Sequence, residues 1–431
     1  MRFVEHPQRQ QVVGEMHLRR FPRLSLPARV IQLVRMLDGA ERATERQALT
    51  QCPGVVTIAG QRHMEARWSD TIRMSWEGHS EASTLTLTWT GQGATPLEWA
   101  LPSDAESARA LAWAEALPGR VIRATDLIMV ADEATAGPLV ASANFSTSHL
   151  VSCEVGGGAR LWSDFRINAD GYGRLILAAN GLPPDDLARC VQRLQELGNY
   201  RNMALTGLPV AQAGWAQLEQ IARNLEDTGR ALHQNEQRDD DLLSALSAQS
   251  AALLSIASAC DFRMSATAAY ALIVGDRLAE LNVQPIAGFQ SLADFTGRRF
   301  FPAMRTCRAF TDRLALLSGR AAQFTALLRA RVETHIENQN GRLLASMDAS
   351  ARMQLRLQHL VEGLSTVAIS YYGLGLLSYP LKAAEKVHPT FSATLALGIA
   401  TPVVVLTVFG LMGRLRKRLI SADDKPAAEG A

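Results

Sequence analysis

The chain has 431 residues, more than the roughly 50–250 of an ordinary domain, so two or three structural units are expected. Hydrophobic residues make up 47% of the chain and charged residues 20%, which excludes a wholly disordered protein. The net charge of +2 gives the whole molecule no electrostatic reason to bind nucleic acid, so no nucleic-acid partner is predicted.

Residues 1–210 have the pattern of an α+β domain. In Thr84–Thr90, polar and apolar residues alternate with period two, as in a sheet with one solvent-facing side. Helices are expected at Pro27–Leu37, Ala105–Ala116 and Pro184–Leu205. Other strand-like runs follow one another without helices between them, which favours a mainly antiparallel sheet. These runs are Glu65–Trp76, Val121–Val130, His149–Val155, Arg160–Ile167 and Arg174–Ala178. We therefore predict an α+β head over residues 1–210.

Residues 211–360 read as long helices. Apolar residues recur at alternating spacings of four and three from Phe310 to Leu328, which is a heptad seam. The pattern loosens near Val332 and resumes at Leu343 and Met347. A second tract, about 211–257, has a similar register. We predict a coiled-coil-like bundle or stalk, which could pack within one chain or between chains.

Two long uncharged runs follow within residues 361–413. Leu364–Leu381 contains 18 residues without a formal charge, and Phe391–Gly413 contains another 23. A helix needs about 20 mainly apolar residues to cross a bilayer core. The runs therefore predict a two-helix transmembrane hairpin; the alternative is a buried helical hairpin in a soluble core. Because no proline lies between Pro302 and Pro380, one continuous helix could lead into the first run.

The charges around the two runs predict an orientation. The connector Lys382–Thr390 carries Lys382 and Lys386, and Arg342, Arg352 and Arg356 precede the first run. The tail, residues 414–431, starts with the membrane-flanking basic residues Arg414, Arg416, Lys417 and Arg418. By the positive-inside rule, both termini are expected in the cytoplasm and the connector outside it.

One face of the first run is polar or small. Glu362, Thr366, Ser370 and Gly373 are spaced by four, four and three residues, so they share one side of a helix. This face could line a pore in an assembly. Small residues and hydroxyls also let helices approach closely in lipid, so it could equally be a helix-packing face.

Chemistry-bearing motifs are scarce. No P-loop, nucleophile elbow, zinc-protease helix or dinucleotide fingerprint is present, so neither an enzyme activity nor a cofactor is predicted. The best ligand-like group is Glu77, His79 and Glu81, which would project from one face of a strand and suit a divalent cation. Ordinary solvent-facing strands produce the same pattern. Glu15 and His17 lie in a basic cluster that could hold an anionic group or pair with acidic residues.

Several segments resemble a family of uncharacterised bacterial membrane-anchored proteins that is classified only as a domain of unknown function. The segments are His6–Arg9, Glu15–Arg19, Trp76–His79, Leu161–Arg166, Gln192–Leu205, Pro302–Cys307 and Val361–Tyr372. The resemblance covers nearly the whole chain. It implies anchoring in the bacterial inner membrane and carries no established activity or catalytic residues.

The order of elements is also similar to that of CorA-type divalent-cation channels, which assemble as pentamers lined by their first span. The Gly-Met-Asn sequence that follows the first span in those channels is replaced here by Tyr379-Pro-Leu-Lys-Ala. Lys382 and Lys386 stand where an acidic loop would attract cations, which argues against magnesium conduction.

Together these features predict a membrane-anchored, non-enzymatic protein with a large cytoplasmic head. One reading is a divergent CorA-like oligomeric ion transporter. The alternative is a membrane-tethered scaffold or sensor that binds a cytoplasmic partner or ligand. The expected partners are the lipid bilayer, further copies of the chain and a cytoplasmic protein.

Overall fold

The computed structural model describes residues 3–9, 12–13, 24–59, 62–91, 98–234, 237–387 and 392–423. It divides into two compact units, Met1–Ala326 and Leu327–Ala431, and each is described by itself.

The first unit is built on one mixed sheet. In the described residues, ten strands lie in the order β10-β7-β8-β9-β6-β1-β5-β4-β3-β2. Strands β6 and β9 pair in parallel, and the other strand pairs are antiparallel. The strands are β1 (Ala28–Met36), β2 (Val55–Ala59), β3 (His63–Arg67), β4 (Ile72–Gly78), β5 (Ala82–Thr90), β6 (Arg120–Val130), β7 (Val151–Val155), β8 (Ala159–Ser163), β9 (Gly173–Ala178) and β10 (Gln284–Pro285).

Helices cover both faces of the sheet. On one face, α2 (Gly39–Thr50) and α3 (Ala105–Glu115) share a core with the apolar side chains of β1, β3, β4 and β5, and α4 (Glu133–Ser142) packs on β6 and β9. On the other face, α5 (Pro184–Leu205) packs with β1, β6 and β7–β9. The predicted helices over Ala105–Ala116 and Pro184–Leu205 are confirmed as α3 and α5.

Two predictions about the sheet are wrong. Pro27–Leu37 is not a helix but the central strand β1, paired with β5 and β6. A strand buried on both faces lacks the period-two alternation that distinguishes it from a helix. The expected solvent-facing side of β5 is also absent, because Thr84, Thr86 and Thr88 are only 3–5% exposed. Their side of the sheet is the one that carries α5.

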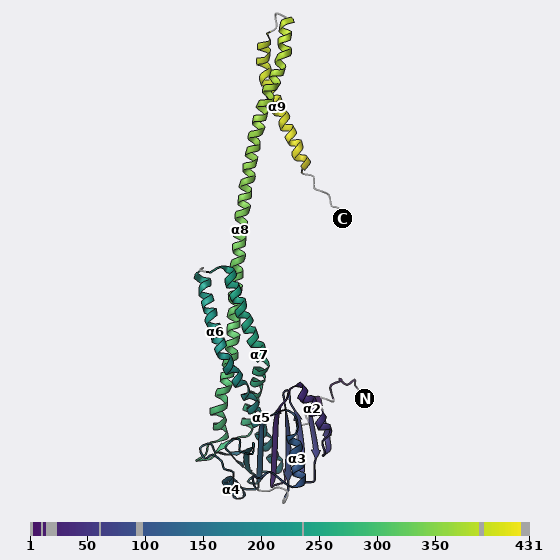
Figure 1. The fold of residues 1–431 in the computed structure, drawn as a ribbon, viewed down its shortest axis with the longest axis vertical. Helices are drawn as coiled ribbons and strands as arrows, with labels where there is room; N and C mark the ends of the chain where they lie inside the picture. The colour runs from purple at the N-terminus through teal and green to yellow at the C-terminus, as the bar shows by residue number, and fades with distance from the viewer. Residues whose placement is uncertain are drawn as a thin grey trace. The chain divides into compact units, whose positions relative to one another are not determined.

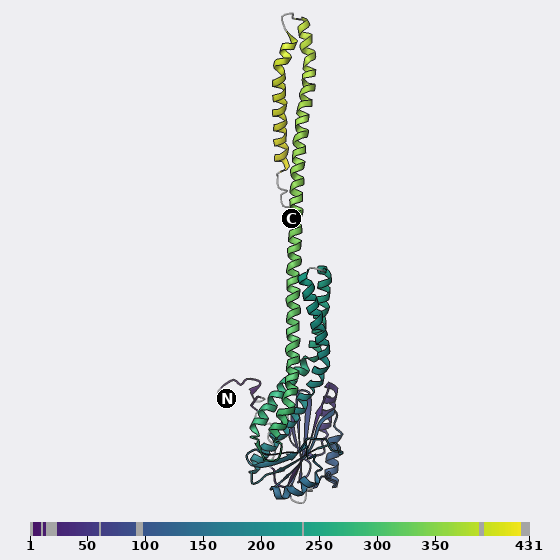
Figure 2. The ribbon, with the colours of Figure 1, turned by 90° about the vertical axis from the view of Figure 1, so that its left-hand side faces the viewer.

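A helical bundle belongs to the same unit. It contains α6 (Gly207–Gln234), α7 (Asp239–Glu280) and the first part of α8 (Leu292–Val387), side by side in both views (Figures 1 and 2). The predicted heptad residues Phe310, Leu314, Leu317 and Ala321 are buried. Tyr270 of α7 lies in the core formed with the sheet, so much of the predicted stalk packs with the head.

The second unit contains the rest of α8 and α9 (Ala393–Asp423). As predicted, α8 is one uninterrupted helix. It continues through Pro380 to Val387, so Lys382 and Lys386 lie in the helix rather than in a nine-residue connector, which corrects that boundary. Lys382 and Lys386 are spaced four apart with Glu385 between them, a polar turn that ordinary helix propensity supports.

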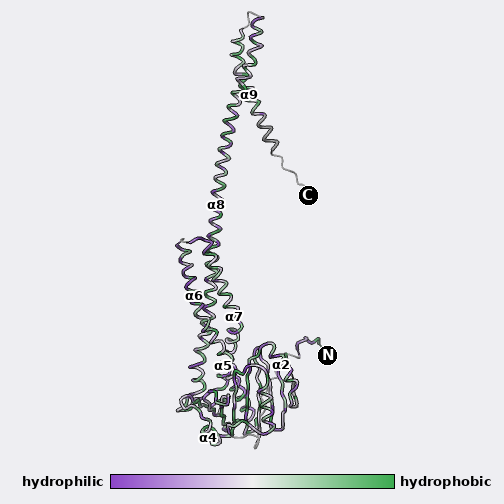
Figure 3. The backbone as a smooth tube through the Cα atoms, in the orientation of Figure 1, coloured by the Kyte–Doolittle hydropathy of each residue, from purple (hydrophilic) through white to green (hydrophobic). Residues whose placement is uncertain are grey.

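The hairpin of α8 and α9 is rich in hydrophobic residues, which the hydropathy colouring marks in green along both helices (Figure 3). Side chains such as Leu364, Tyr372, Leu376, Leu406 and Phe409 are 69–74% exposed. By length and composition alone, α7, α8 and α9 each contain a stretch that could cross a membrane. Of these, α7 packs against α5 and α6 in the first unit.

Candidate functional site

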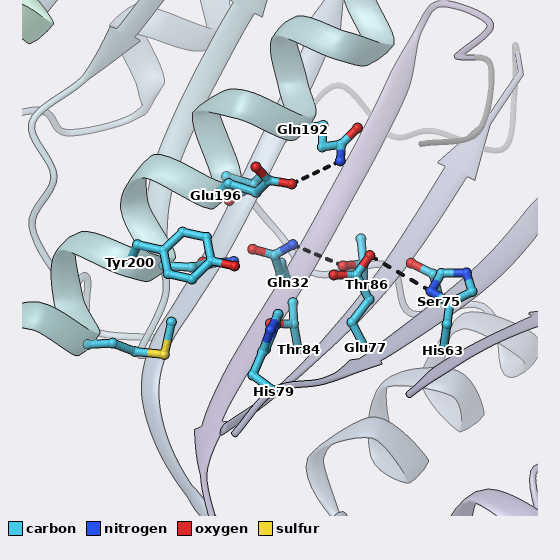
Figure 4. A pocket seen from close by; sticks show the side chains of 13 residues that line it. Gln32, His63, Ser75, Glu77, His79, Thr84, Thr86, Gln192, Glu196 and Tyr200 are labelled. Atoms are coloured by element: carbon cyan, nitrogen blue, oxygen red, sulfur yellow. Dashed lines mark hydrogen bonds and ion pairs between the residues drawn. The ribbon is translucent and has the colours of Figure 1, made fainter. Parts of the chain in front are cut away.

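A polar pocket lies between the sheet and α5, with a cavity volume of about 40 Å³ (Figure 4). All its lining residues except one methionine carry a polar side chain. They are Gln32, His63, Ser75, Glu77, His79, Thr84, Thr86, Gln192, Gln195, Glu196, Asn199, Tyr200 and Met203.

Strand register brings the sheet residues of the pocket together. In one cross-strand row, Gln32 of β1 lies opposite Thr86 of β5, which lies opposite Ser75 of β4. In the next row, Thr84 lies opposite Glu77, and Glu77 lies opposite His63 of β3. We call these two rows the polar ladder. Because side chains alternate along a strand, all members of the polar ladder project toward the face that carries α5.

Helix α5 supplies the other wall. Gln192, Gln195, Glu196, Asn199 and Met203 recur at helical spacing, so they form one stripe facing the polar ladder. The apolar residues of α5, such as Leu187 and Leu194, lie in the main core. The helix therefore carries a polar stripe beside an apolar one on its buried side.

Arg123 of β6 lies behind this pocket and organises it. Its Nη1 donates to Gln32 Oε1 at 3.2 Å, Gln195 Oε1 at 2.6 Å and Asn199 Oδ1 at 2.6 Å. Burial, together with the smaller effect of the nearby Arg201 guanidinium, lowers the pKa of Arg123 to about 9. All three acceptors are uncharged amides, so the cation is held by dipoles.

The same contacts fix the orientation of the amides. With their oxygens bonded to Arg123, the amide nitrogens must point elsewhere. Gln32 Nε2 donates to Thr86 Oγ1 at 3.0 Å. Gln195 is 1% exposed, and its Nε2 is buried without a hydrogen-bond partner. A buried donor without an acceptor is costly, which makes this group a candidate contact for a ligand or a water molecule.

Gly198 of α5 makes room for the guanidinium. A Cβ at this position would lie 2.6 Å from Arg123 Cζ, closer than real side chains approach. The glycine is therefore needed for a close approach between the helix and a side chain of the sheet.

Acidic and imidazole groups occupy the opposite end of the pocket. His63 is 5% exposed; its Nε2 lies 3.3 Å from Glu65 Oε1 and its Nδ1 3.8 Å from Glu77 Oε1 (Figure 4). The Nε2 atom of His79 lies 3.2 Å from Thr84 Oγ1. On the helix side, the Glu196 carboxylate accepts from Arg277 Nε and from Gln192 Nε2.

The predicted group of Glu77, His79 and Glu81 is only partly brought together. Glu77 and His79 line the pocket, whereas Glu81 pairs with Arg263 of α7. The strand β4 ends at Gly78, so these residues do not share one strand face as the alternation suggested. Within the described residues, no three His, Cys, Asp or Glu side chains form a group that could hold a metal ion.

Sequence reasoning missed the centre of this site. Gln32, Arg123, Gln195 and Asn199 did not stand out, although Gln32 is a polar residue inside the apolar run Val30–Val34. A polar side chain in the middle of a buried strand is the signal that could have indicated it, because such a group needs a partner in the core.

In the hairpin, the polar face of α8 packs on α9. Thr366 and Ser370 are 8% and 3% exposed, and their hydroxyls donate to Glu362 O and Thr366 O one turn earlier. A Cβ on Gly373 would lie 3.8 Å from Val404 Cγ1 of α9. Glu362 lies at the end of this face, with its carboxylate 3.7 Å from His359 Nδ1.

Two other predicted groups are described only in part. Arg414 lies in α9 and is exposed, while the side chains of Arg416, Lys417 and Arg418 lie outside the described residues. Glu15 and His17 also lie outside them.

Comparison with known proteins gives a family and no function. No curated protein and no solved structure matches the chain, so the likeness to CorA-type channels gains no support from relatives. A family model described as "Protein of unknown function (DUF3422)" matches residues 4–419. The chain therefore belongs to this family, as its sequence segments indicated.

Proposed function

We propose that the protein is a membrane-anchored, non-enzymatic sensor whose head binds a small polar ligand in the pocket between the polar ladder and α5. The observation that carries the proposal is the buried donor of Gln195, held in a polar cavity by Arg123. A helix that packs on a sheet normally buries apolar side chains, because each polar group buried there must find a partner. A cavity lined by oriented polar groups suits recognition.

The pocket limits the size and chemistry of the ligand. A cavity of about 40 Å³ holds a few water molecules or a ligand of a few heavy atoms. Donors such as Gln195 Nε2 lie at the α5 side, and the Glu77 carboxylate lies at the sheet side. A matching ligand offers an acceptor to one side and a donor to the other, as a small amide or amino acid does.

Binding is tested on the full chain purified in detergent. Urea, formamide, glycine and acetate at millimolar concentration serve as probes, and the shift of the thermal unfolding midpoint is measured for each. Ligand binding stabilises the folded state, so a probe that fits raises the midpoint. The shift should disappear in Glu77→Gln and in Thr84→Val. The control Glu226→Gln changes an exposed carboxylate on α6 and should keep it.

The proposal fails if none of these probes shifts the midpoint, or if the pocket variants and the control respond alike. In either case the cavity would hold only structural water.

Membrane anchoring is supported by the apolar surface of the hairpin. Exposed apolar patches of this extent are unusual on a soluble protein and are expected on a segment in contact with lipid. Alkaline extraction of membranes tests the anchor: the chain should stay in the pellet. An arginine at mid-span opposes insertion by about 2.5–3.5 kcal/mol, so a Val403→Arg, Leu406→Arg double variant should leave the pellet more readily. If the double variant stays in the pellet as firmly as the parent, anchoring through α9 is contradicted.

A second candidate function is oligomeric ion transport. The observation that favours it is Glu362, a partly exposed carboxylate at the entrance to the predicted first span. Against it, the hydroxyls that would continue a polar path are buried on α9 and bonded within α8. Ion flux into proteoliposomes that is lost in Glu362→Ala would support transport, and absence of flux in the parent chain would remove it.

A further inference from the structure

One segment of α8 has an apolar face that the described chain leaves uncovered. Residues 333–361 are exposed throughout. The segment nevertheless carries large apolar side chains that are 50–70% exposed: Ile336, Leu343, Leu344, Met347, Met353, Leu355, Leu357, Leu360 and Val361. A single helix in water is marginally stable, and most helices in proteins are held by packing of an apolar face.

The apolar residues follow a heptad register. Steps of four and three from Ile336 place Ile336, Leu343, Ser350 and Leu357 at the d positions. The a positions then hold Asn340, Met347, Gln354 and Val361. The flanking e and g positions add Leu344, Met353 and Leu360, so the face is wide and continuous. Of the large apolar residues, Leu355 alone falls on the outer side.

Charge distribution agrees with this register. Between Asn338 and Val361, the charged residues are Arg342, Asp348, Arg352 and Arg356, and all four fall at b, c or f. Asp348 pairs with Arg352 on its own helix. Within 336–361, the one charge at a, d, e or g is Glu337 at e, and the g position that faces it in a parallel pair is the uncharged Val332, so a second copy can approach this face without like-charge repulsion.

We propose that residues 336–361 form a parallel coiled coil with a second copy of this chain. Eight of the exposed apolar side chains lie at a, d, e or g, and at roughly 100 Å² each they could cover about 800 Å² per copy. That is the area which each partner buries in a standard stable interface. Asn340 at an a position fixes the direction, because two asparagines meet only when the helices run parallel and in register, and such a residue favours two strands.

This inference is independent of the ligand pocket, and it is tested by cysteine cross-linking of the full chain in detergent. Leu343→Cys and Val361→Cys place thiols at d and a, near the two ends of the coiled coil. Ala345→Cys and His359→Cys are matched controls at f. The parent chain is the background control, because its five cysteines are buried or half-buried.

Mild oxidation should link most of the Leu343→Cys and Val361→Cys chains into covalent dimers, with little dimer from the f controls or the parent. An antiparallel pair would not link Val361→Cys, and non-specific association would link the f positions as readily as the a and d positions. Either result overturns the proposal.

Light scattering supplies a second readout that does not need a cysteine. The protein part of the parent's protein–detergent complex should have at least twice the mass of one chain. A Leu343→Asp, Leu357→Asp double variant should fall to one chain, while the control Ala345→Asp, Ala349→Asp should not. A monomeric parent, or a mass unchanged in the Leu343→Asp, Leu357→Asp variant, overturns the proposal.

Discussion

Arg123 is a buried cation whose side-chain oxygen partners, Gln32, Gln195 and Asn199, are all amides. Removing a guanidinium from water is expensive, and amide dipoles compensate for less of the loss than a carboxylate does. Burying Arg123 therefore lowers the free energy of unfolding, while its hydrogen bonds fix three side chains in one arrangement. Destabilising groups of this kind are typical of binding sites.

Gly198→Ala tests how tightly this arrangement is packed. In the parent, the new Cβ would lie 2.6 Å from Arg123 Cζ, so the change should lower the free energy of unfolding by about 1–3 kcal/mol. In an Arg123→Ala background the space is free, and the same change should raise it by up to about 1 kcal/mol, because alanine is the better helix former. Denaturant unfolding of the parent, the two single variants and the double variant measures both effects. If Gly198→Ala changes the free energy of unfolding in the same direction in both backgrounds, the close approach is contradicted.

At the scale of single residues, the sequence predicted part of the pocket. Alternation along a strand identified Glu77 and His79, because it needs only local information. It placed Glu81 wrongly, because the end of β4 at Gly78 depends on the turn that follows. Arg123 and Asn199 could not be brought together from the sequence, since they lie 76 residues apart.

Helix α6 approaches α8 closely at two glycines, Gly214 and Gly229. A Cβ on Gly214 would lie 2.5 Å from the ring of Phe310, whose side chain is 1% exposed and also meets the ring of Trp215. A Cβ on Gly229 would lie 2.9 Å from the ring of Phe324 of α8. The contact between α6 and α8 therefore depends on two missing side chains, while the heptad pattern supplies the rest of the interface.

Gly214→Val should separate these helices and lower the free energy of unfolding by about 1–3 kcal/mol, as overpacking of a core does. Gly275→Ala is the matched control: it lies in α7 with open space around its Cβ position and should raise the free energy of unfolding by about 0.5–1 kcal/mol. Thermal unfolding measures both. Equal effects of the two changes would show that a side chain at position 214 fits between α6 and α8, which would contradict the close approach.

Elements differ in how far the sequence predicts them. The long continuous part of α8 follows from the absence of proline between Pro302 and Pro380 and from a heptad repeat that is visible over a few residues. The strand β1 was mistaken for a helix because both its faces are buried. The strand order, and the parallel pairing of β6 with β9, depend on contacts across the whole sheet, which local patterns do not encode.

For the whole molecule, the distribution of positive charge predicts that the end of α8 near Glu385 lies outside the cytoplasm and the head inside. In intact cells, a membrane-impermeant maleimide should label Glu385→Cys. It should label Ser318→Cys only after the membrane is disrupted. Both positions are exposed on α8, so the difference reports the side of the membrane. Labelling of Ser318→Cys in intact cells would reverse the topology.

The amides held by Arg123 have a thermodynamic consequence for any occupant of the pocket. Their rotamers are already fixed before a ligand arrives, so binding would lose little side-chain entropy. The discrimination between ligands would then come mainly from hydrogen-bond geometry. A molecule that differs by a single donor or acceptor should bind with a distinctly different enthalpy, which calorimetry can resolve.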